Sequence, residues 1–341
     1  MFERKKHGQA FVKGKNLIID NDYMILADGY SLKKVFIDGR TAEDIGTVEL
    51  SLYSQLSKYP LTRRIFRAEI TSLYRLADNA CLVVAKKGIF KKDVSEDFRK
   101  VWNLFRGSKP LNLCILPNGH IYFGEYFQNR EKKAVQVYGS HDNGETWQIV
   151  YTFEKGTINH IHGLFYDTYT DRIWFLTGDR EEECLIGYTE DEFKTTTIVF
   201  RGGQEYRACQ LFFYPSFICY ATDSQYMQNE IKYFDRMTLE IKTLARIQGP
   251  AVKGGQSGNI SFLSTTVEPS DVNLDKDAHI WISKDGMYWE DVYSATKDCR
   301  PPIFQFGTFE FPQYLEPITD RLYFSGRALK GHDGKSTFIK I

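Results

Sequence analysis

The eight residues from Ser140 to Trp147 constrain the fold more than any other stretch, because they read S-x-D-x-G-x-T-W. In a tight turn between two strands, the Asp carboxylate and the Ser hydroxyl can bond turn amides, and Gly adopts a conformation that other residues resist. The Trp side chain packs beneath the turn as an apolar plug. A shortened copy, Ser283 to Trp289, lies further along the chain. Two copies predict repeated β-hairpins, in which this motif stabilises the turn and takes no part in catalysis.

Short apolar strands that end in small or polar residues recur along the chain. They cover residues 24–28, 82–85, 121–125, 173–179, 218–223, 260–265 and 322–327. Their spacing is that of β-propeller blades, roughly 40 to 50 residues with insertions. Long amphipathic helices are missing from the pattern, and residues 42–59 are the best candidate for a short helix or an irregular insertion. We therefore expect an all-β β-propeller with seven blades of four antiparallel strands, or six blades if the N-terminal unit is only part of one.

The whole chain, residues 1–341, is expected to form one domain, since toroidal all-β folds keep such lengths in one unit. An open ring would leave exposed strand edges. We expect the ring to close by pairing of the C-terminal strands, which end at 337–341, with the N-terminal chain near Phe11 and Val12.

Charge and composition exclude several classes of partner. Lys and Arg together number 44, and Asp and Glu also number 44, so no overall field draws the protein to nucleic acid or to an anionic membrane. Residues 1–16 contain no apolar run of signal-peptide length, and no stretch is apolar enough to span a membrane. We expect a soluble cytoplasmic protein. Its six scattered cysteines are expected to be buried free thiols.

The pair His160 and His162 is the strongest candidate for chemistry. In a strand, residues two apart share a face, so both imidazoles point the same way. Paired imidazoles can ligate a divalent metal, bind a carboxylate or act as a general base. Backbone carbonyls could equally satisfy two structural histidines. No cofactor is required by the pattern, and a divalent metal would bind at these two residues.

Carboxylates occupy nearly equivalent positions in successive repeats, at Glu125, Asp179, Asp223 and Glu268. Carboxylates that face each other across a cleft perform the acid and base steps of glycosidic bond hydrolysis. Asp also caps turns at strand ends, which is the structural alternative. We expect His160, together with His162, Glu125, Asp179 and Glu268, to form the catalytic set where the blades converge on the axis.

Polar and cationic residues near the same strands are candidates for substrate binding. An Arg guanidinium can bind a carboxylate through two parallel hydrogen bonds, which would suit an acidic sugar. Ordinary surface ion pairs are the alternative for each of them. The expected binding residues are Arg67, Tyr126, Gln204, Arg207, Asp223, Arg327 and His332. The sequence has no G-x-S-x-G elbow, P-loop, dinucleotide glycine fingerprint or H-E-x-x-H motif, so nucleotide chemistry is unsupported.

The turn motif is an Asp-box, and with its second copy and the repeat length it makes the chain resemble the sialidase-like, or BNR-repeat, β-propeller superfamily. The resemblance runs from about Arg67 to the C-terminus. The strings 122–127, 160–163, 173–179 and 330–334 are similar to an uncharacterised branch of glycosyl-hydrolase-like propellers. Sialidases carry an Arg triad, a Tyr/Glu nucleophile pair and an R-I-P motif, to which only Phe66-Arg67-Ala68-Glu69 is loosely similar. Propeller polysaccharide lyases often work with His and Tyr, sometimes beside a metal, and the His160 to His162 stretch is similar to such a site.

These patterns together predict a carbohydrate-active enzyme that cleaves or modifies a glycan, possibly an acidic one, at a central axial pocket. A polysaccharide lyase or an unusual glycoside hydrolase fits the residues, with an oligosaccharide or polysaccharide as substrate. The alternative is a propeller that binds a glycan or a protein without catalysis. The sequence does not indicate an oligomeric state.

Overall fold

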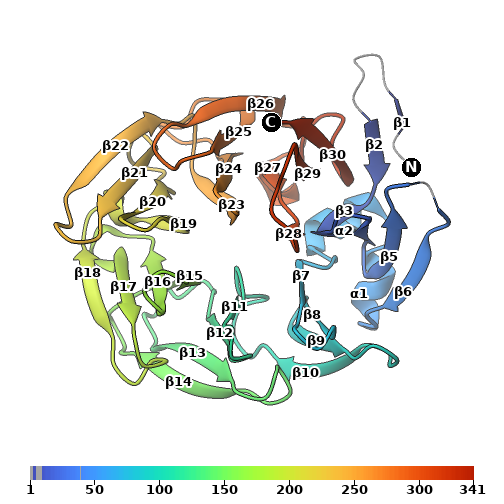
Figure 1. The fold of residues 1–341 in the computed structure, drawn as a ribbon, viewed down its shortest axis with the longest axis horizontal. Coiled ribbons are helices and arrows are strands. Elements are labelled where there is room, and N and C mark those ends of the chain that lie inside the picture. The colour runs from blue at the N-terminus through green and yellow to red at the C-terminus, as the bar shows by residue number, and fades with distance from the viewer. Residues whose placement is uncertain (1–2, 5–9, 39) are drawn as a thin grey trace.

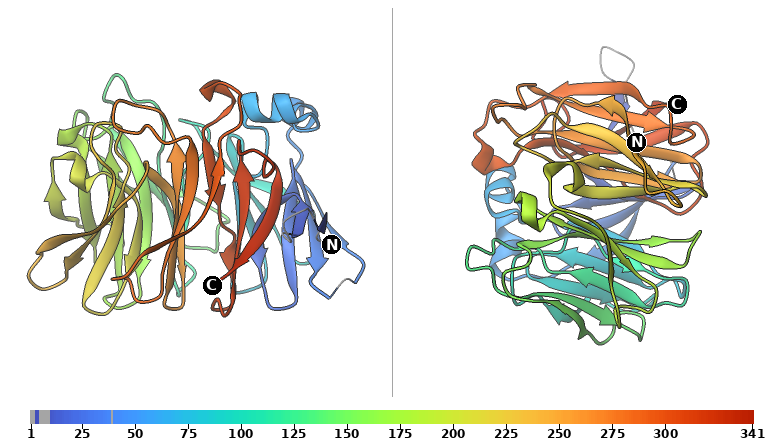
Figure 2. Two further views of the ribbon diagram at one scale, coloured as in Figure 1. Left: turned by 90° about the horizontal axis from the view of Figure 1, so that it is seen from above. Right: turned by 90° about the vertical axis from the view of Figure 1, so that its left-hand side faces the viewer.

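The structure is a computed structural model that describes residues 3–4, 10–38 and 40–341. Most elements are β-strands, in sheets of antiparallel neighbours. The helical elements are α1 (Leu52–Leu56), α2 (Pro60–Phe66), and the 3-10 turns η1 (Glu181–Glu183), η2 (Gln204–Tyr206) and η3 (Pro302–Phe304). Figure 2 shows α1 and α2 together at one face of the ring.

Four sheets contain four strands each, and each is built from consecutive strands. The first holds β7 (Ser72–Arg75), β8 (Cys81–Ala85), β9 (Gly88–Lys92) and β10 (Arg99–Asn103). The second holds β11 (Cys114–Ile115), β12 (Ile121–Gly124), β13 (Val135–Ser140) and β14 (Gln148–Phe153). The third holds β15 (His160–Asp167), β16 (Arg172–Gly178), β17 (Leu185–Thr189) and β18 (Thr197–Arg201). The fourth holds β19 (Ala208–Phe213), β20 (Phe217–Thr222), β21 (Glu230–Asp235) and β22 (Ile241–Arg246).

Two further sheets contain more strands. A five-stranded sheet holds β3 (Lys15–Ile19), β4 (Tyr23–Asp28), β5 (Ser31–Phe36), β6 (Glu43–Thr47) and β28 (Gln313–Tyr314), which runs parallel to β3. A nine-stranded sheet combines β23 (Ala251–Ser257), β24 (Ile260–Val267), β25 (Asp277–Ser283), β26 (Glu290–Thr296), β27 (Gly307–Glu310), β29 (Arg321–Arg327), β30 (Lys335–Lys340), β2 (Ala10–Lys13) and β1 (Glu3–Arg4). Only two residue pairs join β24 to β27 within it.

The sheets follow one another around a central axis, so the fold is the all-β propeller that the repeats predict (Figure 1). Strands β7, β11, β15, β19 and β23 lie nearest the axis, and β10, β14, β18, β22 and β26 lie at the rim. A cavity of about 710 Å³ lies along the axis, and residues of β3, β7, β11, β15, β19, β23 and β27 line it. The blade count stays a prediction.

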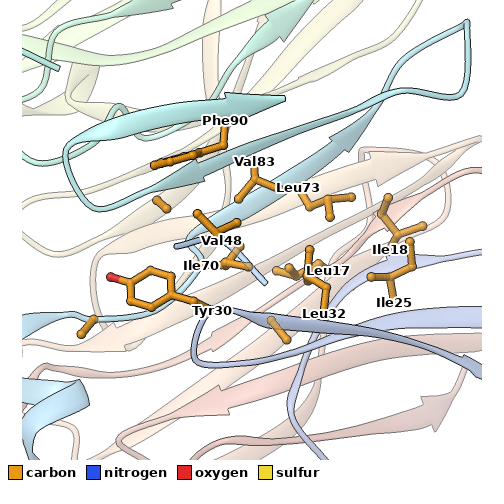
Figure 3. Packing of buried hydrophobic residues seen from close by; sticks show 13 residues of the cluster. Leu17, Ile18, Ile25, Tyr30, Leu32, Val48, Ile70, Leu73, Val83 and Phe90 are labelled. Carbon is orange, nitrogen blue, oxygen red and sulfur yellow. The ribbon is translucent and has the colours of Figure 1, made fainter. Parts of the chain in front are cut away.

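The apolar repeats identified in the sequence are the second strands from the axis. They coincide with β4, β8, β12, β16, β20, β24 and β29. These strands are almost wholly buried, because other strands flank them on both sides and neighbouring sheets cover both faces. The core therefore lies between sheets. Figure 3 shows one part of it, where Leu17, Ile18 and Leu32 of the N-terminal sheet pack toward Leu73 and Val83 of the next.

The N-terminal chain completes the sheet that contains the C-terminal strand. Val12 of β2 pairs with Ser336 of β30, antiparallel, and the next pair joins Lys13 to Lys335. The amide of Asn16 donates to the hydroxyls of Ser325 and Ser336, at 2.9 Å in each case. Residues more than three hundred positions apart thus share one sheet.

The turn at Ser140–Trp147 has the hydrogen bonds that its sequence predicts. Asp142 accepts from the amide of Thr146 at 2.9 Å, and Ser140 accepts from the amide of Gly144, whose φ is +85°. The indole of Trp147 is buried and donates to the carbonyl of Gly144 at 3.2 Å. The copy at 283–289 repeats these bonds.

A third turn of this kind, at 189–195, was missed in the sequence because Phe193 stands where the motif has Gly. Thr189 accepts from the amide of Phe193 at 2.9 Å, and Asp191 accepts from the amide of Thr195 at 2.9 Å. Phe193 adopts a φ of +72°, and its ring is buried in the core. Packing therefore compensates for a backbone conformation that favours glycine.

One expectation needs correction. Cys114, Cys184, Cys209 and Cys219 are buried free thiols as expected, but Cys81 is only partly buried and Cys299 is exposed. The segment 42–59 contains the short helix expected there, α1, which follows strand β6. In the part of the chain that the structure describes, no helix has the length and hydrophobicity needed to cross a membrane.

Candidate functional site

His160 and His162 are the first and third residues of β15, one of the innermost strands of the ring. Both are buried, and their Nε2 atoms approach to 3.1 Å. The Nδ1 of His160 donates to the carbonyl of Phe127 at 3.0 Å, and the Nδ1 of His162 donates to the carbonyl of Ala208 at 3.0 Å. Because a carbonyl can only accept, each ring carries a proton on Nδ1, so Nε2 is the atom of each ring that can donate to Asp179 when protonated or bind a metal ion when not.

Asp179 completes a triad with the two rings. It follows β16 directly, and the pairing of His160 with Gly178 brings it beside the start of β15. One oxygen, Oδ1, is 3.4 Å from each Nε2. The other oxygen accepts from the side-chain amide of Asn159 at 2.7 Å. Burial alone would raise the pKa of the Asp179 carboxyl, but hydrogen bonds and charge from His160 and His162 hold it well below its usual range.

Arg207 links this triad to the next sheet. Its Nη2 is 3.1 Å from Oδ1 of Asp179, and its Nε is 3.7 Å from Oδ2 of Asp223. Burial would lower the pKa of Arg207, but the charges of Asp223 and Asp179 outweigh it and raise the pKa. Asp223 follows β20, just as Asp179 follows β16, and this shared position brings both acids to one end of the ring.

Gln204 and Cys209 support the two acids. The Gln204 side chain donates to the backbone carbonyl of Asp179 at 2.9 Å and accepts from Ser224 at 2.8 Å. The Cys209 thiol donates to Asp223 at 3.3 Å. Burial and the neighbouring Asp223 charge raise the pKa of the Cys209 thiol well above its usual value, so it stays protonated.

Tyr126 and Glu268 stand at the edge of this group. The ring of Tyr126 lies 4.3 Å from that of His160, centroid to centroid. Burial raises the pKa of the Tyr126 hydroxyl, and the charges of Asp223 and Asp179 add to the rise. Burial also raises the pKa of Glu268, and the charges of Asp223 and Asp179 raise it further. Among the described residues, Glu268 has no side-chain hydrogen bond or ion pair, so its carboxyl group is open to a ligand.

The triad has the donor set of a divalent metal site. The ligand atoms of His160, His162 and Asp179 all lie within 4.8 Å of one another. Carbonyls that accept from the outer Nδ1 fix the tautomer of metal-binding histidines and orient their rings, as found here. Two lone pairs at 3.1 Å repel each other unless a proton or a cation lies between them. His162 also forms a second set with Cys209 and Asp223. The residues present therefore fit a metal ion.

Glu125, expected in the catalytic set, is engaged elsewhere. Its carboxylate forms a two-pronged ion pair with Arg106, 2.8 Å at Oε1, and accepts from the amide of Gln136 at 2.9 Å. Burial raises the pKa of Glu125 despite these bonds. Its backbone carbonyl accepts from the amide of Ile161, so Glu125 supports the strand that carries the histidines rather than contacting their rings.

Three expected binding residues do not join the triad. Arg67 is an exposed residue at the end of α2, with a φ of +50°. His332 donates from Nδ1 to the carbonyl of Lys330 and lies 2.7 Å from the hydroxyl of Tyr293. Arg327 pairs with Glu310 and Glu69 instead.

Sequence reasoning missed three contributors. Cys209 lies two residues after Arg207 at the start of a strand, a spacing that could have placed it beside Asp223. Asn159 precedes the histidine pair but had no assigned role. Arg106 comes from another loop, and nothing in the sequence connects it to Glu125.

A second histidine group lies away from the axis. His120 and His141 stack at 4.2 Å, and Glu192 lies 2.7 Å from Nδ1 of His120. Their ligand atoms also lie within 4.8 Å of one another, although His141 is exposed. This group offers an internal comparison for the buried triad.

Comparison with known proteins shows the fold and nothing finer. No family model and no curated protein matches the chain. Among solved structures, an oligogalacturonate lyase in complex with manganese matches with a TM-score of 0.64 and 10% identity, over 100% of this chain and 96% of the other. Virginiamycin B lyase from Staphylococcus aureus matches with a TM-score of 0.59 and 11% identity, over 97% and 98%. YCF48 bound to D1 peptide matches with a TM-score of 0.57 and 13% identity, over 99% of both chains. These similarities agree that the chain is a β-propeller.

Proposed function

We propose that the protein is a lyase that cleaves an acidic saccharide at the His160, His162 and Asp179 triad, with a divalent cation held there. The tautomers of the two histidines carry this proposal. Both Nδ1 protons point outward to carbonyls, so both Nε2 atoms face one carboxylate oxygen, 3.4 Å from each, and a cation that displaces their protons would be bound by all three atoms. The surrounding charge is favourable for a cation, because Asp179, Asp223 and Glu268 outnumber Arg207.

The similar oligogalacturonate lyase in complex with manganese supports the choice of metal and substrate class. Its name describes that protein, and only the fold is shared at 10% identity. A divalent cation bound to this triad would act as a Lewis acid on a substrate carboxylate. Arg207, beside Asp179, adds a fixed positive charge at the same place.

Glu268 and Tyr126 would perform the proton transfers. A carboxyl group with a raised pKa is a stronger base than an ordinary one when ionised, so Glu268 would take the proton from the carbon next to the uronate carboxylate. The bond from the neighbouring carbon to the glycosidic oxygen then breaks, and a carbon–carbon double bond forms. Tyr126 holds its proton because burial raises its pKa, and it would donate that proton to the leaving oxygen.

The test is incubation of the protein with oligogalacturonate, with Mn²⁺ or with a chelator, while the absorbance of unsaturated uronate is followed. We expect product only with the metal. Glu268→Gln should lower turnover by about 100-fold or more, because general bases contribute that much. Glu230→Gln is a matched control, since Glu230 lies on β21, the third strand of its sheet, and pairs there with Lys232.

Two results would reject the lyase. New reducing ends without the absorbance would indicate a hydrolase. Saccharide binding without any turnover, unaffected by substitution of His160 and His162, would indicate a binding propeller without catalysis.

A further inference from the structure

Cations surround one carboxylate in the wall of the central cavity. We call this group the channel cluster; it consists of Lys15, Lys109, Lys253, Arg327 and Glu310. Burial alone would raise the pKa of Glu310, but Arg327, Lys15, Lys253 and Lys109 together hold it well below its usual range. All four cations therefore lie close enough to act on one group. They come from sequence positions far apart, and the ring brings them together.

Two of the four cations have partners. Lys15 donates to the carbonyl of Thr71 at 2.6 Å and lies 3.2 Å from Glu310. Arg327 lies 2.6 Å from Glu310 and 3.3 Å from Glu69. Both are more than four-fifths buried at the side chain. These contacts use the two carboxylates at the cluster.

Lys109 and Lys253 have no such partner. Within the described ranges, neither ammonium has a carboxylate within 4.0 Å or a hydrogen-bond acceptor. Burial lowers the pKa of Lys109 well below its usual value, and the charges of Arg327, Lys253 and Lys15 lower it further. Burial likewise lowers the pKa of Lys253 to about 8, although Glu310 opposes the shift. Four cations thus share two carboxylates in an enclosed space.

Lys109 and Lys253 are partly buried, and removing an ion from water without a partner is costly. A structural role would pair each lysine, as Lys15 is paired. The central cavity measures about 710 Å³ and has Lys15, Lys253 and Glu310 in its wall, whereas Lys109 lines a separate, smaller pocket with Glu125 and Tyr126. The volume of the central cavity is within the range of small-molecule sites. The unpaired ammonium group of Lys253 in the wall of such a cavity is an arrangement that an anionic ligand completes.

We propose that the channel cluster binds an oxyanion group, a carboxylate or a phosphate, of a small molecule that occupies the central cavity, with Lys253 as its direct partner. Anion binding stands independently of the proposed lyase. Only the choice of an acidic sugar as carrier of the carboxylate rests on that proposed function. Lys253 lies on β23, next to the inner strand β19 that contains Cys209, so the channel cluster adjoins the group around Asp223.

The experiment is isothermal titration of the full chain at pH 7 with galacturonate, inorganic phosphate and galactose. We expect the two anions to bind and the neutral sugar to bind far more weakly. Lys253→Met should weaken anion binding by about tenfold or more, the loss of one charged hydrogen bond. Lys109→Met should weaken it less, because Lys109 lies outside the cavity wall and acts only through its charge. Lys284→Met is the control, because Lys284 is exposed in the turn between β25 and β26.

The titrations with galacturonate and with phosphate distinguish two sources of the anion. Binding of galacturonate without phosphate identifies an acidic sugar, and tight binding of phosphate identifies a free or phosphorylated ligand; both support the site. Failure of both anions to bind, or binding that persists in the Lys109→Met/Lys253→Met double variant, overturns it. If the variants do not fold, the melting temperature of the wild type provides the test. Phosphate should raise this melting temperature more than chloride does at equal ionic strength. Equal melting temperatures in phosphate and in chloride would refute the site.

This site and the proposed lyase can fail separately. Galacturonate should still bind to a His162→Gln variant, because His162 is not a member of the channel cluster. A protein that binds galacturonate but never cleaves a saccharide would retain the anion site and lose the lyase. A protein that cleaves a saccharide with both lysines replaced, at unchanged KM, would retain the lyase and lose the anion site.

Discussion

Removing one imidazole from the triad should reduce the stabilisation of the protein by Mn²⁺ by about half or more. The perturbation is His162→Gln, in a protein first treated with a chelator. The Nε2 of His162 lies 3.1 Å from that of His160 and 3.4 Å from Asp179, so its loss removes one of three ligand atoms. Gln keeps a polar side chain of similar reach, which limits the damage to packing.

The size of the effect follows from linkage. A ligand present at 100 times its dissociation constant stabilises the native state by about 2.7 kcal/mol. Unfolding entropy of about 2.1 cal/mol/K per residue gives about 0.7 kcal/mol per degree for 341 residues. The wild type should therefore gain about 4 °C in melting temperature. The variant should gain about 2 °C or less, because loss of a ligand costs at least tenfold in affinity and leaves about 1.4 kcal/mol of stabilisation at most.

Differential scanning calorimetry with and without MnCl₂ measures this shift. The matched control is His141→Gln, which disrupts the second histidine group and leaves the triad intact. It should keep the full shift. Equal shifts in the wild type and His162→Gln, loss of the shift in His141→Gln, or no shift in the wild type would each refute the reasoning.

Three further predictions concern packing, site geometry and pH. Trp147→Ala should lower the free energy of unfolding by about 3–5 kcal/mol in urea denaturation, because the buried indole plugs the core beside Phe123; an effect below about 1 kcal/mol would contradict this. Gly178→Ala should weaken Mn²⁺ binding in titration calorimetry, since the new Cβ would lie 2.7 Å from Cε1 of His162; unchanged affinity would show that the ring can move freely. Phosphate affinity should fall as pH rises through about 8, where Lys253 loses its proton in the folded state. Its pKa is lowered from 10.5, so between these values the unfolded chain binds more protons and stability should rise with pH; denaturation at pH 8 and pH 10 checks the sign.

The sequence predicts the second strand of each repeat well, because these strands are buried on both faces and read as continuous apolar runs. Strand β16, Arg172–Gly178, is an example. The innermost strands are harder to recognise. Strand β23, Ala251–Ser257, contains Lys253 and two glycines, because it faces the cavity rather than a packed core.

The triad was partly predictable from the sequence, because regular strand patterns place its members. The period of two places His160 and His162 on one face of a strand, and Asp179 follows an obvious apolar strand. Which carboxylates join them depends on contacts between loops. Glu125 has the same position in its repeat as Asp179, yet Arg106 from the preceding loop engages it. The lysines of the channel cluster meet only through closure of the ring.

The pairing of β2 with β30 has a consequence for how the protein is made. On the ribosome β2 emerges more than three hundred residues before β30, its partner in the sheet. Strand β28 likewise pairs with a strand from much earlier in the chain, β3. Contacts of such long sequence separation form slowly. The nascent protein must therefore keep β2 and β3 free of wrong partners until β28 and β30 have been made, and the ring around the central cavity is incomplete before that moment.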